Sequence, residues 1–193
     1  MKDHTNPPDA TLTPTGASSV DVHPGPSAPM HDAKIRSPLA RERDARATDE
    51  VVTVLNELIE TSRDGEKGFA LAARDSKEAT LTTLFREGEQ SFRSAVAELQ
   101  DQVQRLGAKP DTDGSMKAAV HRGWISLKSA VTSLDSKAIL EECERGQDYA
   151  KAKYAEALNY ELPEELRMLI ERQHRDVIER HDQVRDLRNQ YLV

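Results

Sequence analysis

The feature that most constrains this 193-residue chain is an apolar stripe in its last roughly thirty residues. From Pro163 onward, apolar side chains recur about every 3.5 residues, as on one face of a helix. The stripe consists of Leu166, Ile170, Val177, Val184, Leu187 and Tyr191, and it is interrupted by two polar residues, Gln173 and His181. Pro163 suits the first turn of a helix, where its missing N–H costs nothing. Such a helix is ~45 Å long, so elements of similar length must cover its stripe.

Three further long helices are predicted from the same periodicity. The first runs from Thr48 or Asp49 to about Asp75, with Val51, Leu55, Ile59, Ser62, Glu66, Phe69 and Ala73 facing inward. The second follows a short turn and presents Leu81, Phe85, Glu89, Phe92, Val96, Leu99, Val103 and Leu106. Gly107 is expected to end it as a C′ glycine. The third runs from about Asp135 to Tyr160 and presents Ile139, Cys143, Gln147, Ala150, Tyr154 and Ala157. Because no alternating strand pattern is present, the fold class is all-α.

The N-terminal region has a different composition. Residues 1–46 contain seven of the nine prolines and almost no periodic hydrophobicity. Such a segment cannot bury enough apolar surface to offset the entropy lost on ordering. We therefore predict a disordered Pro-rich tail over 1–46 and one helical domain over 47–193.

Composition limits the partners and the compartment. The net charge of −7 argues against a nucleic-acid partner held through its phosphates. No run of eighteen apolar residues is present, so no membrane span is expected. A single cysteine, Cys143, fits a reducing compartment. The expected localisation is cytoplasmic.

Segment lengths predict the topology. Helices one and two form one hairpin, and helices three and four form another. Between them, Ser115 to Ser133 read as a shorter amphipathic helix that contains Trp124. This helix is long enough to return the chain along most of the bundle. A four-helix bundle with one long crossover is the ferritin-like arrangement.

Polar residues on the inner faces are the candidate site. Glu66, Glu89, Glu144 and His181 are predicted at similar depth, ~15–20 Å below one end of the bundle. Carboxylates and imidazole suit iron or manganese, so these four are the candidate metal ligands. Gly65, Gly68, Gly88 and Gly146 lie near the same level and indicate a close helix approach, a bulge or room for a ligand.

The metal pattern is incomplete. Di-iron proteins of this architecture carry two Glu-x-x-His motifs, whereas Glu89 is followed by Phe92 and His181 is preceded by Ile178. One such motif occurs at Glu171 and His174, but Glu171 points away from the stripe. The alternative is a hydrogen-bonded polar layer of Glu66, Glu89, Gln173 and His181, which we favour because buried polar groups must be satisfied. Neither Cys143 nor the pair His121 and Arg122 suggests a catalytic device, so an enzyme is disfavoured.

Several stretches resemble a bacterial family of ferritin-like four-helix-bundle proteins described as domain of unknown function 2383. They are LNELIETSRDGEKGF (55–69), HRGWISLKSA (121–130), ILEECERGQDYA (139–150) and ERQHRDVIERHDQVRDLR (171–188). The resemblance covers roughly residues 48–190. It implies a ferritin-like bundle in a bacterial, cytosolic protein and no established activity.

Two functions follow from these observations. The first, which we favour, is a non-catalytic bundle with a stress-related or scaffolding role and with itself as the expected partner in a homo-oligomer. The alternative is a ferritin-like protein that binds iron or manganese through Glu66, Glu89, Glu144 and His181. A partner-binding module with the tail as a tether is a third, weaker hypothesis. No cofactor is expected under the first.

Overall fold

A computed structural model describes residues 37–111 and 135–191 of the chain. Within these two ranges the secondary structure consists of four α-helices and no strand, so the all-α prediction is confirmed there. The helices are α1 (Pro38–Asp75), α2 (Ala79–Arg105), α4 (Ser136–Ala157) and α5 (Glu164–Gln190). The predicted crossover helix, with His121, Arg122 and Trp124, lies outside the described residues, as does most of the predicted tail.

The start of α1 differs from the prediction. The helix begins at Pro38, ten residues before Thr48, so the predicted boundary at residues 46 and 47 falls inside it. The first buried residue is nevertheless Val51, close to where the stripe begins. Residues 38–50 have no apolar stripe, and periodicity therefore could not detect them. Their Ala, Arg and Glu residues favour helix, and Arg46 pairs with Glu42 one turn away at 2.6 Å.

The other helix ends follow the expected local chemistry. Asp135 caps α4, because its side chain accepts a hydrogen bond from the Lys137 N–H at 3.0 Å. Gly107 ends α2 with φ +79°, a conformation that glycine adopts without steric cost. The bonds from Gly107 N to Gln104 O and from Ala108 N to Val103 O form a Schellman motif. Pro163 is the N-cap of α5.

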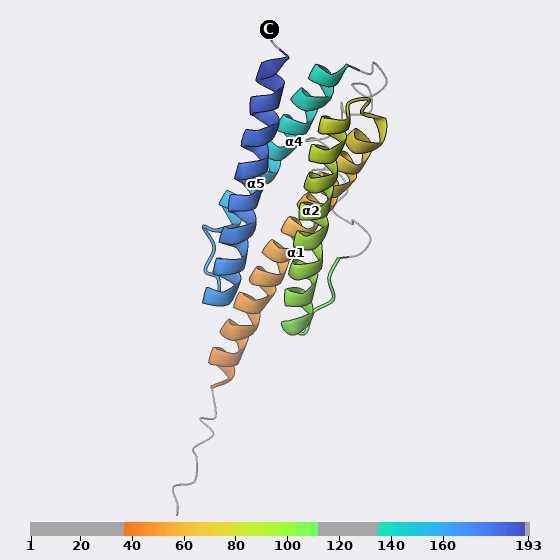
Figure 1. Cartoon of the computed structure of the whole chain (residues 1–193). Coiled ribbons are helices and arrows are strands. Elements are labelled where there is room, and N and C mark those ends of the chain that lie inside the picture. The colour runs from red at the N-terminus through yellow and green to blue at the C-terminus, as the bar shows by residue number, and fades with distance from the viewer. Residues whose placement is uncertain (1–36, 112–134, 192–193) are drawn as a thin grey trace, which may run out of the picture. The chain divides into compact units, whose positions relative to one another are not determined.

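The four helices pack as two hairpins (Figure 1). α1 packs most extensively on α2, and α4 packs on α5; α1 also contacts α4, while α2 and α5 approach each other least. Glu78, in the α1–α2 turn, accepts hydrogen bonds from the Ser136 hydroxyl and the Tyr191 hydroxyl. The start of α4 and the end of α5 therefore lie at the same end of the bundle as this turn. Since α2 runs away from that end, α2 ends and α4 begins at opposite ends of the bundle.

The core contains most of the apolar residues predicted to face inward, together with Val54, Leu58, Ala72 and Leu140, which were in no predicted stripe. Its largest fully buried side chains are Tyr154, Phe69, Phe85, Leu55, Leu58, Ile59, Leu81, Leu99, Leu140, Ile170 and Gln147. Of the four described helices, none has the length and apolar character needed to cross a membrane.

Two of the helix glycines permit the close contact of α1 with α2. A Cβ on Gly65 would stand 2.7 Å from the Phe92 ring, and a Cβ on Gly88 would stand 2.8 Å from the Phe69 ring. Each helix thus receives an aromatic ring from the other at a position without a side chain. The two rings, Phe69 and Phe92, stack with centroids 5.9 Å apart. Close helix approach is therefore the role of these two glycines.

Candidate functional site

Glu66 and Glu89 are held by the same arginine. Arg93 on α2 donates from Nε to Glu66 at 2.8 Å and from an Nη atom to Glu89 at 2.5 Å. The Glu66 side chain is 26% exposed and the Glu89 side chain is 16% exposed. Both therefore lie at the edge of the α1–α2 contact and not on the core faces predicted for them. The buried residues are instead their neighbours Gly65 and Gly88. A glycine carries no apolar signal, so the inner face was misplaced by one residue at both positions.

Glu144 and His181 lie close together between α4 and α5. The His181 ring is 6% exposed overall, and its Nε2 lies 4.0 Å from Glu144 and 3.0 Å from Asp148. Its Nδ1 lies 3.1 Å from Asp182, and this hydrogen bond is the main reason that the pKa of Asp182 is lowered. Glu144 is also bound by Arg188 at 2.6 Å. The structure brings these two predicted ligands together, each with another protein partner.

The structure places the four predicted ligands in two pairs, Glu66 with Glu89 and Glu144 with His181. In the ranges 37–111 and 135–191, no three or more His, Cys, Asp or Glu side chains are grouped so as to hold an ion. Glu66 and Glu89 are bridged by Arg93, which a metal would have to displace. In this arrangement each of the four side chains already has a protein partner in place of an ion.

A chain of hydrogen bonds crosses the core instead. The Tyr154 hydroxyl lies 2.9 Å from the Ser62 hydroxyl and donates to Gln173 Oε1 at 3.0 Å. Gln173 then donates to Glu98 at 2.7 Å, and Arg172 donates to the same carboxylate at 3.0 Å. This chain links all four described helices. Burial raises the pKa of Tyr154, so the phenol stays protonated at neutral pH.

Sequence reasoning found only part of this polar chain. Gln173 was expected in a polar layer, whereas Glu98 lay outside every predicted stripe. The available signal was Tyr154, because a buried tyrosine hydroxyl requires a hydrogen-bond partner. His174 does not act with Glu171; its ring stacks on Tyr154 with centroids 6.4 Å apart. Its pKa is lowered by burial and, less strongly, by Lys151.

Two other buried groups on α4 have contrasting chemistry. Cys143 is fully buried, and burial raises the pKa of its thiol well above the usual value, which disfavours the reactive thiolate. It packs as a small hydrophobic residue, as expected. Gln147 is also fully buried, and neither atom of its amide has a hydrogen-bond partner among the described residues. Its position on the inner face was predicted; its missing partners were not.

A groove lies between α2 and α5, the two helices that approach each other least. Its volume is about 660 Å³. The residues that line it include Arg86, Glu87, Gln90, Ser91, Phe92, Ser94, Ala95 and Glu98 from α2, Tyr154 from α4, and Arg172, Gln173, Asp176, Val177, Glu179 and Arg180 from α5. Two ion pairs cross it, Arg180 to Glu87 at 3.2 Å and Arg172 to Glu98 at 3.0 Å. The hydrogen-bonded chain of Tyr154 and Gln173 forms part of its wall.

Comparison with known proteins supplies the family. No curated protein matches the chain. A family model described as "Domain of unknown function (DUF2383)" matches residues 50–160, more than half of the chain. The match includes α2, α4 and all of α1 that contributes to the core, with the Gly65–Phe92 and Gly88–Phe69 contacts and both Tyr154 and Gln147. The chain therefore belongs to the DUF2383 family.

Proposed function

We propose that this protein is a non-catalytic helical bundle with a scaffolding role. The observation that carries the proposal is that each candidate ligand is engaged by another side chain. Arg93 binds Glu66 and Glu89. Likewise, Arg188 binds Glu144, and Asp148 binds His181. These groups satisfy one another, as a polar layer that fixes helix register would require.

The ferritin-like assignment and the cellular setting belong to the same proposal. Two hairpins, with α2 ending and α4 beginning at opposite ends of the bundle, are consistent with the single long crossover of ferritin-like folds. The resemblance described above points to a bacterial source. Cys143 is the only cysteine, and its burial without a disulfide is consistent with a reducing cytoplasm.

Binding of iron or manganese is the second candidate, and one observation favours it. His181 Nε2 faces both Asp148 and Glu144, and these atoms belong to ligand types that such ions accept. Binding there would require Glu144 to exchange Arg188 for the metal.

Thermal melts with and without Fe(II) or Mn(II) separate the two candidates. A ligand that binds only the folded state raises the melting temperature, so under our proposal neither metal changes it. Glu89→Gln should cost no more than ~0.5 kcal/mol, because the Glu89–Arg93 pair is a partly exposed contact one helical turn apart.

The matched variant is His181→Gln, which alters the other pair of candidate ligands. A metal-dependent rise that His181→Gln abolishes and Glu89→Gln preserves would place an ion at the α4–α5 site. A rise lost in both variants would mean that the four side chains act together, and the scaffolding proposal would then be wrong.

A further inference from the structure

The two hairpins contact each other through two helix pairs of unlike character. α1 packs on α4 with buried side chains that include Leu58 and Ala157, and the Ser62 and Tyr154 hydroxyls meet across this contact at 2.9 Å. α2 and α5 approach each other least, and the groove of about 660 Å³ lies between them. We call this second contact the seam; it joins residues 78–98 to residues 172–191. Apolar side chains do not fill the seam as they fill the α1–α4 contact.

Two ion pairs cross the seam along its length. Glu98 accepts hydrogen bonds from Arg172 at 3.0 Å and from Gln173 at 2.7 Å. About three helical turns nearer the start of α2, Glu87 accepts a hydrogen bond from Arg180 at 3.2 Å. In both pairs the carboxylate belongs to α2 and the donor belongs to α5. The pairs follow the antiparallel order of the two helices.

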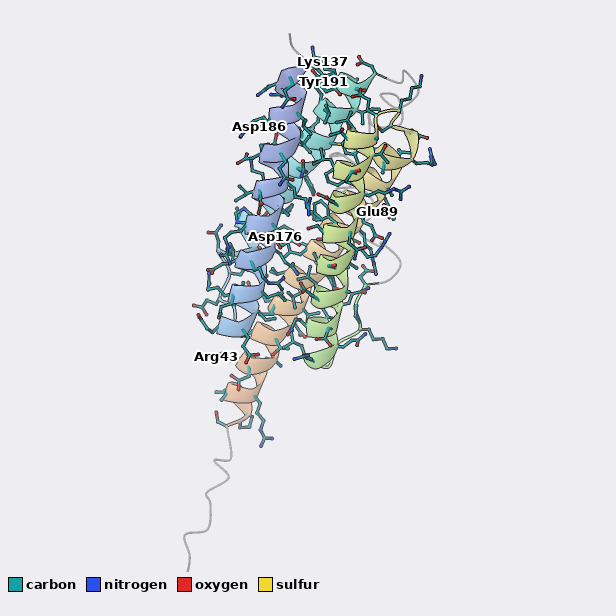
Figure 2. All side chains as sticks on the ribbon, in the orientation of Figure 1. Arg43, Glu89, Lys137, Asp176, Asp186 and Tyr191 are labelled. Carbon is teal, nitrogen blue, oxygen red and sulfur yellow. The ribbon has the colours of Figure 1, made fainter. Side chains whose placement is uncertain are left out.

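A third contact closes the seam at the end of the bundle. Glu78 stands immediately before α2, and its carboxylate accepts a hydrogen bond from the hydroxyl of Tyr191, immediately after α5. Figure 2 shows Tyr191 at the same end of the bundle as Lys137, near the start of α4. The Glu78 carboxylate also accepts a hydrogen bond from Ser136. It therefore connects the first hairpin to both helices of the second.

The seam contacts are accessible to water and salt. The Glu98 and Arg172 side chains are 40% and 49% exposed, and the Glu87 side chain is 56% exposed. Exposed ion pairs of this kind contribute little each and are screened by salt. Regions with few buried apolar contacts open at a lower free energy than the whole protein unfolds. The seam is therefore the weaker of the two contacts between the hairpins.

We propose that the two hairpins separate reversibly along the seam, with the α1–α4 contact as the hinge. Opening breaks the contacts of Glu78, Glu87 and Glu98 with α5 and leaves each hairpin folded. It exposes the groove-lining surfaces of Phe92 and Val177, which are buried when the seam is closed. Because salt screens the ion pairs, ionic strength shifts the equilibrium toward the open form. This inference does not depend on the scaffolding role or on metal binding.

Alkylation of Cys143 by a neutral maleimide tests the inference in the full chain. Cys143 is the only cysteine and is buried. It lies about three helical turns from Tyr154 on the same face of α4, and Tyr154 lines the groove. Opening the seam therefore exposes the thiol. We expect an alkylation rate that depends weakly on urea, because partial opening exposes less surface than unfolding does.

Charge reversal at the seam should accelerate this alkylation. Glu87→Arg combined with Glu98→Arg turns two attractions into repulsions and should raise the rate about tenfold. The matched control combines Asp101→Arg with Glu141→Arg, which makes the same change of charge in ion pairs that lie within one helix. The control should alter the rate by no more than about twofold. Circular dichroism verifies that each variant remains folded.

The sign of the salt effect gives the stricter test. Sodium chloride should accelerate alkylation of the native protein by screening attraction, and slow alkylation of the doubly reversed variant by screening repulsion. Adding Arg180→Glu to Glu87→Arg should return the rate toward the native value. If the doubly reversed chain does not fold, the native protein and this exchanged pair carry the test. Alkylation with the full urea dependence of global unfolding overturns the inference, and so does a native rate that salt does not raise.

Discussion

The two hairpins of this bundle are stabilised by different chemistry. The α1–α2 contact is apolar and reciprocal, with Phe92 against Gly65 and Phe69 against Gly88. The α4–α5 side of the core carries polar groups instead, including Tyr154, Gln147, Gln173 and His181. Both sides are buried, but the first is specified by shape, whereas the second is specified by the hydrogen bonds of Tyr154, Gln173 and His181.

This difference in chemistry affects how far a substitution destabilises each hairpin. An apolar contact without gaps has no alternative partner when a ring is removed, so a cavity remains. A hydrogen-bonded hydroxyl or amide can rotate toward another acceptor after a substitution. We therefore expect the α1–α2 contact to be the more sensitive of the two, and the predictions below test that ranking.

Phe69→Ala should have the largest effect. Phe69 is buried, stacks on Phe92 and also lies 6.2 Å from the Phe85 ring. Removing the ring leaves a cavity in the α1–α2 contact and should lower the free energy of unfolding by ~3–5 kcal/mol. Chemical denaturation measures this change. A loss below ~1 kcal/mol, typical of an exposed site, would mean that this contact does not dominate stability.

Gly88→Ala should destabilise the same contact by adding volume. Its Cβ would stand 2.8 Å from the Phe69 ring, so the ring must move, at a typical cost of ~1–3 kcal/mol. Alanine favours helix over glycine by ~1 kcal/mol, which offsets part of this cost. In a double-mutant cycle, Phe69→Leu should reduce the penalty of Gly88→Ala. Additive effects of the two substitutions would argue against the close approach.

Most of the fold was predictable because apolar periodicity reports burial directly. Most of the apolar residues predicted to face inward are buried, although Val54, Leu58 and Leu140 were missed and Tyr191 is exposed. Gly107 and Asp135 marked helix ends through local chemistry. The start of α1 was wrong by ten residues, because residues 38–50 form a helix without burying a face. Periodicity detects burial and has no information about an exposed helix.

The candidate site was less predictable because polar partners are set in three dimensions. Glu66 and Glu89 were predicted at similar depth, and nothing in the sequence indicated that Arg93 would bridge them. Glu98 and Arg172 likewise join the Tyr154 chain from separate helices. Spacing along one helix fixes which face a residue occupies, whereas the choice of partner depends on the rotation of the neighbouring helix.

Tyr154→Phe should have an intermediate effect, and its cost relative to the native protein should decrease at alkaline pH. It removes the hydroxyl that joins Ser62 to Gln173 and should cost ~1–3 kcal/mol. Since burial raises the pKa of Tyr154, unfolding releases its proton above about pH 10. The contribution of the Tyr154 phenol to stability should therefore be fully present below that pH and be lost above it.

Tyr154→Phe should flatten this alkaline loss, which urea unfolding at several pH values measures. The comparison is best made in a Cys143→Ala background, because burial raises the pKa of the Cys143 thiol and gives a loss of the same sign. If the free energy of unfolding of Tyr154→Phe falls with rising pH as steeply as that of the native protein, the alkaline loss belongs to another group.

Gln147→Leu should have the smallest effect on the free energy of unfolding. The sign of that effect shows whether the buried Gln147 amide stabilises or destabilises the fold. The Gln147 amide is fully buried without hydrogen-bond partners among the described residues. Because an unpaired buried amide is unfavourable, a leucine of similar size should leave stability unchanged or raise it by up to ~1–2 kcal/mol. The matched control is Gln173→Leu, which should destabilise, because Gln173 bonds both Tyr154 and Glu98. If Gln147→Leu destabilises the protein as much as Gln173→Leu, the Gln147 amide is hydrogen-bonded to ordered water. The α4–α5 side of the core would then be as sensitive to substitution as the α1–α2 contact.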